Sequence, residues 1–384
     1  MSVVYVHIGL PKTGTTHLQD RLWRNRDLAL QTSGLLYPGN VISDHFHAAV
    51  HLQPERYLDW ADPAFAGVWP TLVKQMRAWP QTSLISHELF STATSEHIEK
   101  LLDDLSFADE VHVIATVRDL ARQLPSVWQE NVKNQRRASF DEFVDSVAFA
   151  AESNAVGGAD PDRVGEPVVE DEPFWEFQDH VGILSRWARF VGPERVHVVT
   201  VPRTRTKGDG LWERFLAAMN VDPAPLTIPV PSLNSSLSAA QAEFLRHLNQ
   251  RLQPDTIEWR RYERIIKGQV IGEILFEAES GPPQGLSVKH RQWAAGLATE
   301  MVEAIRDAGY DVTGDLADLR VSADGADDDV PMPTDGQVLD VALDTMAEMI
   351  LAAPLPKVGP PLKTRAANVV RRVRRRALAV RRSA

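Results

Sequence analysis

The chain has 384 residues, 43% hydrophobic and 24% charged, so it can bury one large core or two moderate ones. Cysteine is absent, which excludes disulfides, thiolate metal sites and a cysteine nucleophile. The formal net charge of −11 argues against general nucleic-acid binding. The sequence has no signal-peptide pattern and no apolar run near the roughly 20 residues of a membrane-spanning helix, so we expect a cytoplasmic protein.

Strand and helix patterns alternate along the first half of the chain. Short β-rich runs are predicted at 3–8, 83–86, 111–117 and 196–201, and the segments between them are long enough for crossover helices. After residue 230 the strand signal fades, and Ser238 and Gln241 have capping-box spacing at the start of a predicted helix. Residues 151–173 and 321–336 are predicted loops. The pattern predicts an α/β fold, a parallel sheet flanked by helices, with a mainly helical C-terminal half.

The stretch "HIGLPKTGTTHLQ", residues 7–19, directly follows the first predicted strand. Its Gly9 and Gly14 have the spacing of a P-loop, but Thr15 stands where that motif has lysine, and Lys12 lies inside the loop instead. A glycine-bracketed turn between a strand and a helix directs backbone amides toward an anion. The stretch therefore predicts an anion site to which Lys12 adds charge.

Polar residues also follow the next two predicted strands, where ligands of an open parallel sheet bind. His87 and Glu88 follow the run at 83–86, and Arg118 follows the run at 111–117. Ser126 comes eight residues after Arg118, and we expect it near the start of the next helix because Pro125 favours a first helical turn. Since a guanidinium can donate two parallel hydrogen bonds to phosphate, this pattern predicts a base and a second anion site.

These motifs resemble those of the PAPS-dependent sulfotransferases. The phosphosulfate loop of that family is similar to Pro11, Lys12, Thr13, Gly14, Thr15 and Thr16. Its 3′-phosphate site is similar to Arg118 and Ser126, and the resemblance covers about residues 1–250. It implies a P-loop-type sheet related to that of nucleotide kinases.

The resemblance also implies an activity, transfer of a sulfuryl group from PAPS to a hydroxyl acceptor with release of 3′,5′-ADP and no metal. The acceptor would be a glycan, a lipid or a small metabolite. Lys12 would stabilise the departing phosphate, and Glu88 or His87 would accept the proton of the acceptor hydroxyl. The "SxEL" context of Glu88 is similar to that of glycan sulfotransferases, which places Glu88 ahead of His87.

The sequence departs from the aryl and steroid members of the family in its nucleotide contacts. His17 stands where they have a tryptophan that stacks on adenine, and their late Arg-Lys-Gly segment is missing. Candidates for the remaining contacts with PAPS are therefore His17, Asn234 and Ser236. Further candidates are Lys267 with Gly268, and Arg203 with Arg205.

A histidine-rich segment, "DHFHAAVHL", lies between the first two predicted strands. Its spacing allows a metal site formed with Asp44, but no second metal-binding motif accompanies it. We expect His45 and His47 to line the acceptor pocket or to cap a helix.

The C-terminal residues 363–384 contain nine basic residues and no acid, which leaves −20 for the rest of the chain. Valines and leucine interrupt the arginines, a pattern typical of a short amphipathic helix on anionic lipid, on RNA or on the protein's own acidic surface, or of a loosely ordered terminus. We expect a sulfotransferase-like α/β domain over 1–345, helical from about 235, and a proline-containing, arginine-rich tail over 346–384.

Two other functions fit parts of the sequence. A P-loop kinase-like phosphotransferase shares the fold and the anion loop, but the Gly-Lys pair followed by Ser or Thr is missing. A noncatalytic nucleotide- or membrane-binding module would use the arginine-rich tail.

Overall fold

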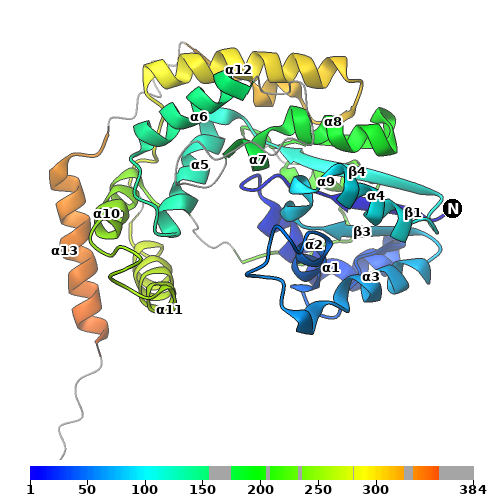
Figure 1. The fold of residues 1–384 in the computed structure, drawn as a ribbon, viewed down its shortest axis with the longest axis horizontal. Helices are drawn as coiled ribbons and strands as arrows, with labels where there is room; N and C mark the ends of the chain where they lie inside the picture. Colours follow the sequence, from blue (N-terminus) through cyan, green and yellow to red (C-terminus); the bar gives the residue numbers. More distant parts are fainter. Residues whose placement is uncertain (155–173, 205–207, 232–235, 280, 324–331, 354–384) are drawn as a thin grey trace, which may run out of the picture. The chain divides into compact units, whose positions relative to one another are not determined.

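A computed structural model describes residues 1–154, 174–204, 208–231, 236–279, 281–323 and 332–353 (Figure 1). Six parallel strands form one sheet in the order β2-β3-β1-β4-β5-β6. Their bounds are β1 Val3–His7, β2 Leu35–Leu36, β3 Thr82–Ser86, β4 Glu110–Val117, β5 Val196–Thr200 and β6 Asp311–Thr313. The predicted α/β fold and its four strands are confirmed. The edge strands β2 and β6 were not predicted, because two or three residues give no measurable alternation.

Helices separate the strands and make up most of the described chain after β5. The helices before β5 are α1 Thr15–Ser33, α2 Asp44–Leu52, η1 Pro63–Phe65, α3 Val68–Arg77, η2 Glu88–Thr92, α4 Ser95–Asp104, α5 Leu120–Lys133, α6 Phe140–Asn154, α7 Phe174–Gln178, α8 His180–Val191 and η3 Pro193–Arg195. Those after β5 are α9 Leu211–Ala217, α10 Ala239–Asn249, α11 Trp259–Tyr262, the π-helical η4 Glu263–Leu275, α12 Val288–Asp307, η5 Leu316–Leu319 and α13 Asp335–Ala352. The more helical C-terminal half is confirmed, with β6 as an addition.

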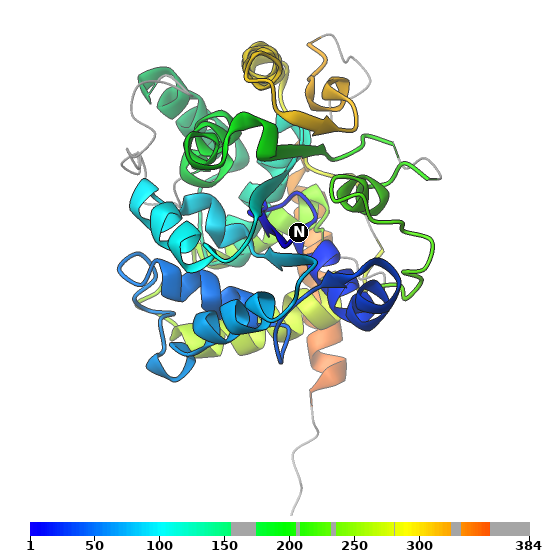
Figure 2. The ribbon, with the colours of Figure 1, turned by 90° about the vertical axis from the view of Figure 1, so that its right-hand side faces the viewer.

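The core has two layers because successive strand residues point to opposite faces of the sheet. Val4 and Val6 pack with apolar residues of α2, α3, α4, α8 and α12, whereas Tyr5 packs with α1 and α9. Figure 2 shows these helices on the two sides of the sheet. Helices on both faces explain why most residues of the central strands β1, β4 and β5 are apolar.

Helix α5 corrects the prediction that a helix begins near Pro125. The helix begins at Leu120, after Asp119, whose side chain accepts a hydrogen bond from Arg122 N at 3.1 Å. Pro125 and Ser126 therefore lie inside the helix, where the proline removes one backbone hydrogen bond. The buried side chains of Leu124 and Trp128 anchor this part of α5, so packing overrides the local cost.

The structure confirms the predicted capping box and shortens both predicted loops. The capping box of Ser238 and Gln241 is confirmed at the start of α10. The predicted loops are partly wrong, since α6 includes residues 151–154 and α13 begins at Asp335. The remainder of the first loop (155–173), residues 324–331 of the second, and the arginine-rich segment 363–384 lie outside the described residues.

The chain divides into two compact units, Met1–Val341 and Ala342–Ala384. The boundary expected after residue 345 stays a prediction. No helix in the described part of the chain has the length and apolar character needed to cross a bilayer.

Candidate functional site

Strand β1 sits at the switch point of the sheet. It pairs with β3 on one side and β4 on the other; the chain runs from β1 toward β2 at one edge of the sheet, and from β3 in the opposite direction to β4. Ligands of open α/β sheets bind beyond the carboxyl end of such a strand. The loop between β1 and α1, residues 8–14, occupies that place.

Gly9 holds this loop against the end of β3. Its φ is 87°, and a β-carbon there would lie 2.8 Å from Glu88 Cβ and 2.9 Å from Glu88 Cα. Only glycine combines a left-handed φ with this close approach. The fold therefore brings Glu88 directly to the anion loop, as the strand-end argument predicts.

Three successive carbonyls of the loop accept hydrogen bonds, one from within the loop and the others from the surrounding protein. The bonds are Thr13 Oγ1 to Leu10 O at 2.6 Å, Gln123 Nε2 to Pro11 O at 2.6 Å, Gln178 Nε2 to Pro11 O at 3.2 Å and Arg118 Nη1 to Lys12 O at 3.2 Å. A trans peptide directs its N–H opposite to its C=O. The amides of Lys12 and Thr13 consequently point away from these donors.

The backbone of the loop has the alternation typical of an anion-binding concavity. Lys12 has φ 66° and Gly14 has φ 97°, both in the left-handed region. Left-handed residues within a turn aim neighbouring amides at one point. Gly14 also precedes the first residue of α1, so the positive end of that helix dipole lies at the loop.

A buried polar network joins the loop to β3 and β4. His7 Nδ1 lies 2.7 Å from Ser86 Oγ, His7 Nε2 lies 3.4 Å from Thr116 Oγ1, and Thr13 Oγ1 lies 2.5 Å from Thr116 Oγ1. Burial, with a smaller contribution from His87, lowers the pKa of His7 to about 3. The imidazole is therefore neutral near pH 7. The hydroxyl of Thr13 belongs to this network and therefore holds the loop against β4.

Arg118 meets the loop from the end of β4. Its Nε is buried and has no hydrogen-bond acceptor among the described residues. Burial and the charge of Arg122 lower its pKa, while Asp119 raises it. A partly desolvated guanidinium with an unused donor is suited to an anionic ligand.

Helix α5 presents one face to the loop. Gln123 contacts Pro11 O and Glu130 contacts Lys12, and Ser126 lies between them at helical spacing (123, 126, 130). Ser126 thus shares the face that meets the loop, although it lies in the second turn of the helix and not at its start.

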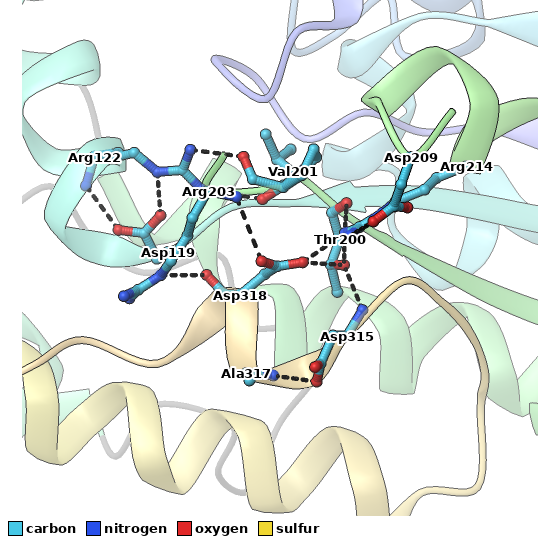
Figure 3. A network of polar contacts seen from close by, with 11 residues as sticks. Asp119, Arg122, Thr200, Val201, Arg203, Asp209, Arg214, Asp315, Ala317 and Asp318 are labelled. Carbon is cyan, nitrogen blue, oxygen red and sulfur yellow. Dashed lines mark hydrogen bonds and ion pairs between the residues drawn. The ribbon is translucent and has the colours of Figure 1, made fainter. Parts of the chain in front are cut away.

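Arg122 links the first turn of α5 to the end of β5 by hydrogen bonds. Its Nη1 and Nη2 donate to Pro202 O at 2.9 Å and Val201 O at 3.0 Å, and its Nε donates to Asp119 at 2.5 Å. Figure 3 shows the continuation of this network along the carboxyl end of β5. The network keeps α5, and with it the face that meets the loop, in a fixed position.

Arg203 belongs to the same edge network. Its backbone N and its Nε donate to Asp318 Oδ1 at 3.3 Å and Asp318 O at 3.2 Å (Figure 3). Arg214 pairs with Asp318 at 2.5 Å and Asp209 at 2.6 Å, and these bonds raise its pKa. The structure thus ties Arg203 to η5, and Arg205 lies outside the described residues.

The two candidate bases differ in their surroundings. His87 Nδ1 accepts a hydrogen bond from Leu89 N at 3.2 Å, so the neutral ring carries its proton on Nε2. Burial lowers the pKa of His87, although Glu88 opposes the shift. Glu88 Oε2 lies 3.4 Å from Gln19 Nε2 of α1. The lone pair of His87 Nδ1 is thus already occupied, whereas the carboxylate of Glu88 has several acceptor positions.

The other expected nucleotide contacts come from two separate parts of the chain. Thr15 is buried in the first turn of α1, and Thr16 and His17 are exposed beside it. Ser236 precedes Leu237, whose backbone N and O both bond to the amide of Gln129 on α5. Asn234 lies outside the described residues.

His45 and His47 lie on α2 in different environments. His45 is buried, with Nε2 2.7 Å from Pro38 O and Nδ1 accepting from Ser86 N at 3.0 Å, and burial lowers its pKa to about 4. Both its ring nitrogens are thus engaged within the fold. His47 stacks on Phe65 with 3.6 Å between ring centroids. No metal-binding group of three or more side chains occurs within the described ranges.

Three side chains at the loop were not anticipated from the sequence. Gln123, Gln178 and Glu130 bond to the loop across 112, 167 and 118 residues of chain. Helical spacing offered a signal for Gln123 and Glu130, because they lie one turn before and one turn after Ser126, but none for Gln178. Comparisons of the chain with models of protein families, with curated proteins and with solved structures found no match.

Proposed function

We propose that the chain is a PAPS-dependent sulfotransferase with a P-loop-type fold. The observation that carries the proposal is that the loop after β1 and Arg118 after the neighbouring strand β4 meet: the amides of Lys12 and Thr13 point away from the donors that bind the loop carbonyls, and the buried Nε of Arg118 has no acceptor among the described residues. PAPS carries two separated anionic groups, a 5′-phosphosulfate and a 3′-phosphate. The loop would hold the first, and Arg118 with Ser126 the second.

The proposed reaction forms a bond between the acceptor oxygen and sulfur while the bond from sulfur to the bridging oxygen breaks. The electron pair of the broken bond stays on the 5′-phosphate, where Lys12 and the loop amides stabilise the charge. The acceptor proton passes to Glu88. The contact of Glu88 with Gly9 supports this role, and so does the hydrogen bond from Leu89 N that occupies the alternative base, His87.

Nucleotide binding distinguishes this proposal from a kinase-like phosphotransferase. We expect the protein to bind 3′,5′-ADP more tightly than ATP in the presence of EDTA, because only 3′,5′-ADP carries a 3′-phosphate for Arg118 and the proposed contacts need no metal. Isothermal titration calorimetry measures both affinities. A preference for ATP that depends on magnesium would overturn the proposal.

Turnover distinguishes the proposal from a noncatalytic binding module. Incubation with PAPS and a panel of glycan, lipid and small-molecule alcohols should yield a sulfated product and 3′,5′-ADP, both detected by mass spectrometry. Lys12→Ala is the matched control, since it should bind nucleotide but form little product. Product formation at the same rate in both proteins would contradict the proposed mechanism.

A further inference from the structure

Glu130 occupies a position between the anion loop and a group of lysines. Its Oε2 lies 2.9 Å from Lys12 Nζ and 3.7 Å from Lys133 Nζ. The side chains of Lys12 and Glu130 are 31% and 36% exposed, so their pair faces the solvent side of the site, whereas Lys133 is 11% exposed. One carboxylate oxygen is therefore shared by two ammonium groups.

A third lysine adds to the positive charge around Glu130. Lys267 of η4 donates to Asn134 Oδ1 at 2.8 Å, directly after the end of α5. Burial raises the pKa of Glu130, but Lys12, Lys133 and Lys267 lower it by more, so the net shift is downward and the carboxylate is ionised. Three lysine side chains thus act on the one carboxylate of Glu130.

We propose that Glu130 is a positioning residue that holds Lys12 in the free protein and stays with Lys133 when the phosphosulfate draws Lys12 away. This inference rests on the proposed function, which places Lys12 at the bridging oxygen. The ion pair must break for Lys12 to reach that oxygen. Because Lys133 already lies 3.7 Å from the same carboxylate oxygen, Glu130 keeps a counter-charge after the exchange.

The arrangement has two opposite effects on the reaction. Before binding, Glu130 neutralises the cation that the anion needs, so it weakens nucleotide affinity. It also keeps the flexible side chain of Lys12 beside the loop, which shortens the search for the bridging oxygen. If Glu130 had a purely structural role, its replacement would instead weaken nucleotide binding.

The test is Glu130→Gln, which keeps shape and removes the charge. We expect about fivefold tighter binding of 3′,5′-ADP, the scale of a partly exposed ion pair, together with about a tenfold lower kcat. Glu130→Asp should retain part of the kcat. The control is Glu99→Gln, an exposed carboxylate of α4, which should change neither quantity. Equal thermal unfolding of all variants shows that they are folded.

The outcomes separate this inference from the proposed function. If the unsubstituted protein binds 3′,5′-ADP, and Glu130→Gln binds it equally or more weakly, the inference is wrong and the proposed function stands. If the unsubstituted protein does not bind 3′,5′-ADP, the proposed function is overturned. In that case the affinity for inorganic pyrophosphate tests the pair of Lys12 and Glu130. If Glu130→Gln does not bind pyrophosphate more tightly than the unsubstituted protein, the inference is overturned as well.

Discussion

Gly9 and Glu88 touch through their backbones: a β-carbon at Gly9 would lie 2.9 Å from Glu88 Cα. The contact joins the carboxyl ends of β1 and β3, which are neighbours in the sheet. It sets the distance between the anion loop and the residue that we propose as the base.

Gly9→Ala should displace the loop, because the new methyl group clashes with Glu88 and the φ of 87° is strained for alanine. We expect more than tenfold weaker binding of 3′,5′-ADP and a lower Tm. Gly67→Ala is the control, since nothing lies within 4 Å of its β-carbon. Calorimetry and thermal unfolding measure both effects, and unchanged binding in Gly9→Ala would show that the contact does not shape the site.

Lys12→Ala should lower kcat by about 10²- to 10³-fold, the scale observed when one donor to a developing negative charge is lost. Affinity for 3′,5′-ADP should fall less, because the lysine acts mainly as the bond to sulfur breaks. Steady-state kinetics with PAPS provide the measurement, and Lys100→Ala, an exposed lysine of α4, provides the control. Equal losses in kcat and affinity would assign Lys12 to ground-state binding only.

Arg118→Ala should weaken 3′,5′-ADP by about 10- to 100-fold, the scale of hydrogen bonds to a charged group. The loss for 5′-AMP, which lacks the 3′-phosphate, should be much smaller and should reflect only the bond from Arg118 Nη1 to Lys12 O. Arg118→Lys keeps the charge but not the planar fork, so an intermediate affinity is expected. Equal losses for both nucleotides would place the 3′-phosphate elsewhere.

Glu88→Gln should reduce kcat by about 10²- to 10⁴-fold, the range typical of general-base catalysis, with little change in 3′,5′-ADP affinity. His87→Asn should have the milder effect, because His87 Nδ1 is already bonded to Leu89 N. Parallel kinetics of the two variants decide the assignment. An active Glu88→Gln beside an inactive His87→Asn would exchange their roles.

Stability should fall as the pH decreases from about 6.5 toward 4. Burial lowers the pKa of His180 to about 4, although a bond to the backbone of Gln178 opposes the shift. A histidine whose folded pKa lies below its unfolded value of about 6.5 binds protons preferentially in the unfolded state, so its contribution is present above that value and lost below it. Between pH 7.5 and 5, the unfolding free energy of His180→Leu should therefore decrease by about 2 kcal/mol less than that of the unsubstituted protein.

Urea unfolding at a series of pH values measures this dependence. Gly67→Ala, which changes no titratable group, is the control and should keep the full decrease. A pH profile that is identical in His180→Leu and the unsubstituted protein would refute the explanation.

The sequence by itself determined the central strands and the position of the anion loop. Strands β1, β3, β4 and β5 are largely buried, and each contains neighbouring apolar residues that can be recognised in the sequence. The loop depends on left-handed backbone at Gly9 and Gly14, a local requirement that glycine reveals directly. The order of strand ends also predicted that Glu88 and Arg118 would meet this loop.

Tertiary structure alone decided which side chains complete the site. Gln178 reaches Pro11 O across 167 residues and Glu130 reaches Lys12 across 118, and such pairings depend on how helices dock and not on local spacing. Packing of Leu124 and Trp128 likewise kept Pro125 inside α5 against its local preference. The edge strands β2 and β6 exist because their neighbours provide hydrogen-bonding partners, a reason that two or three residues of sequence do not contain.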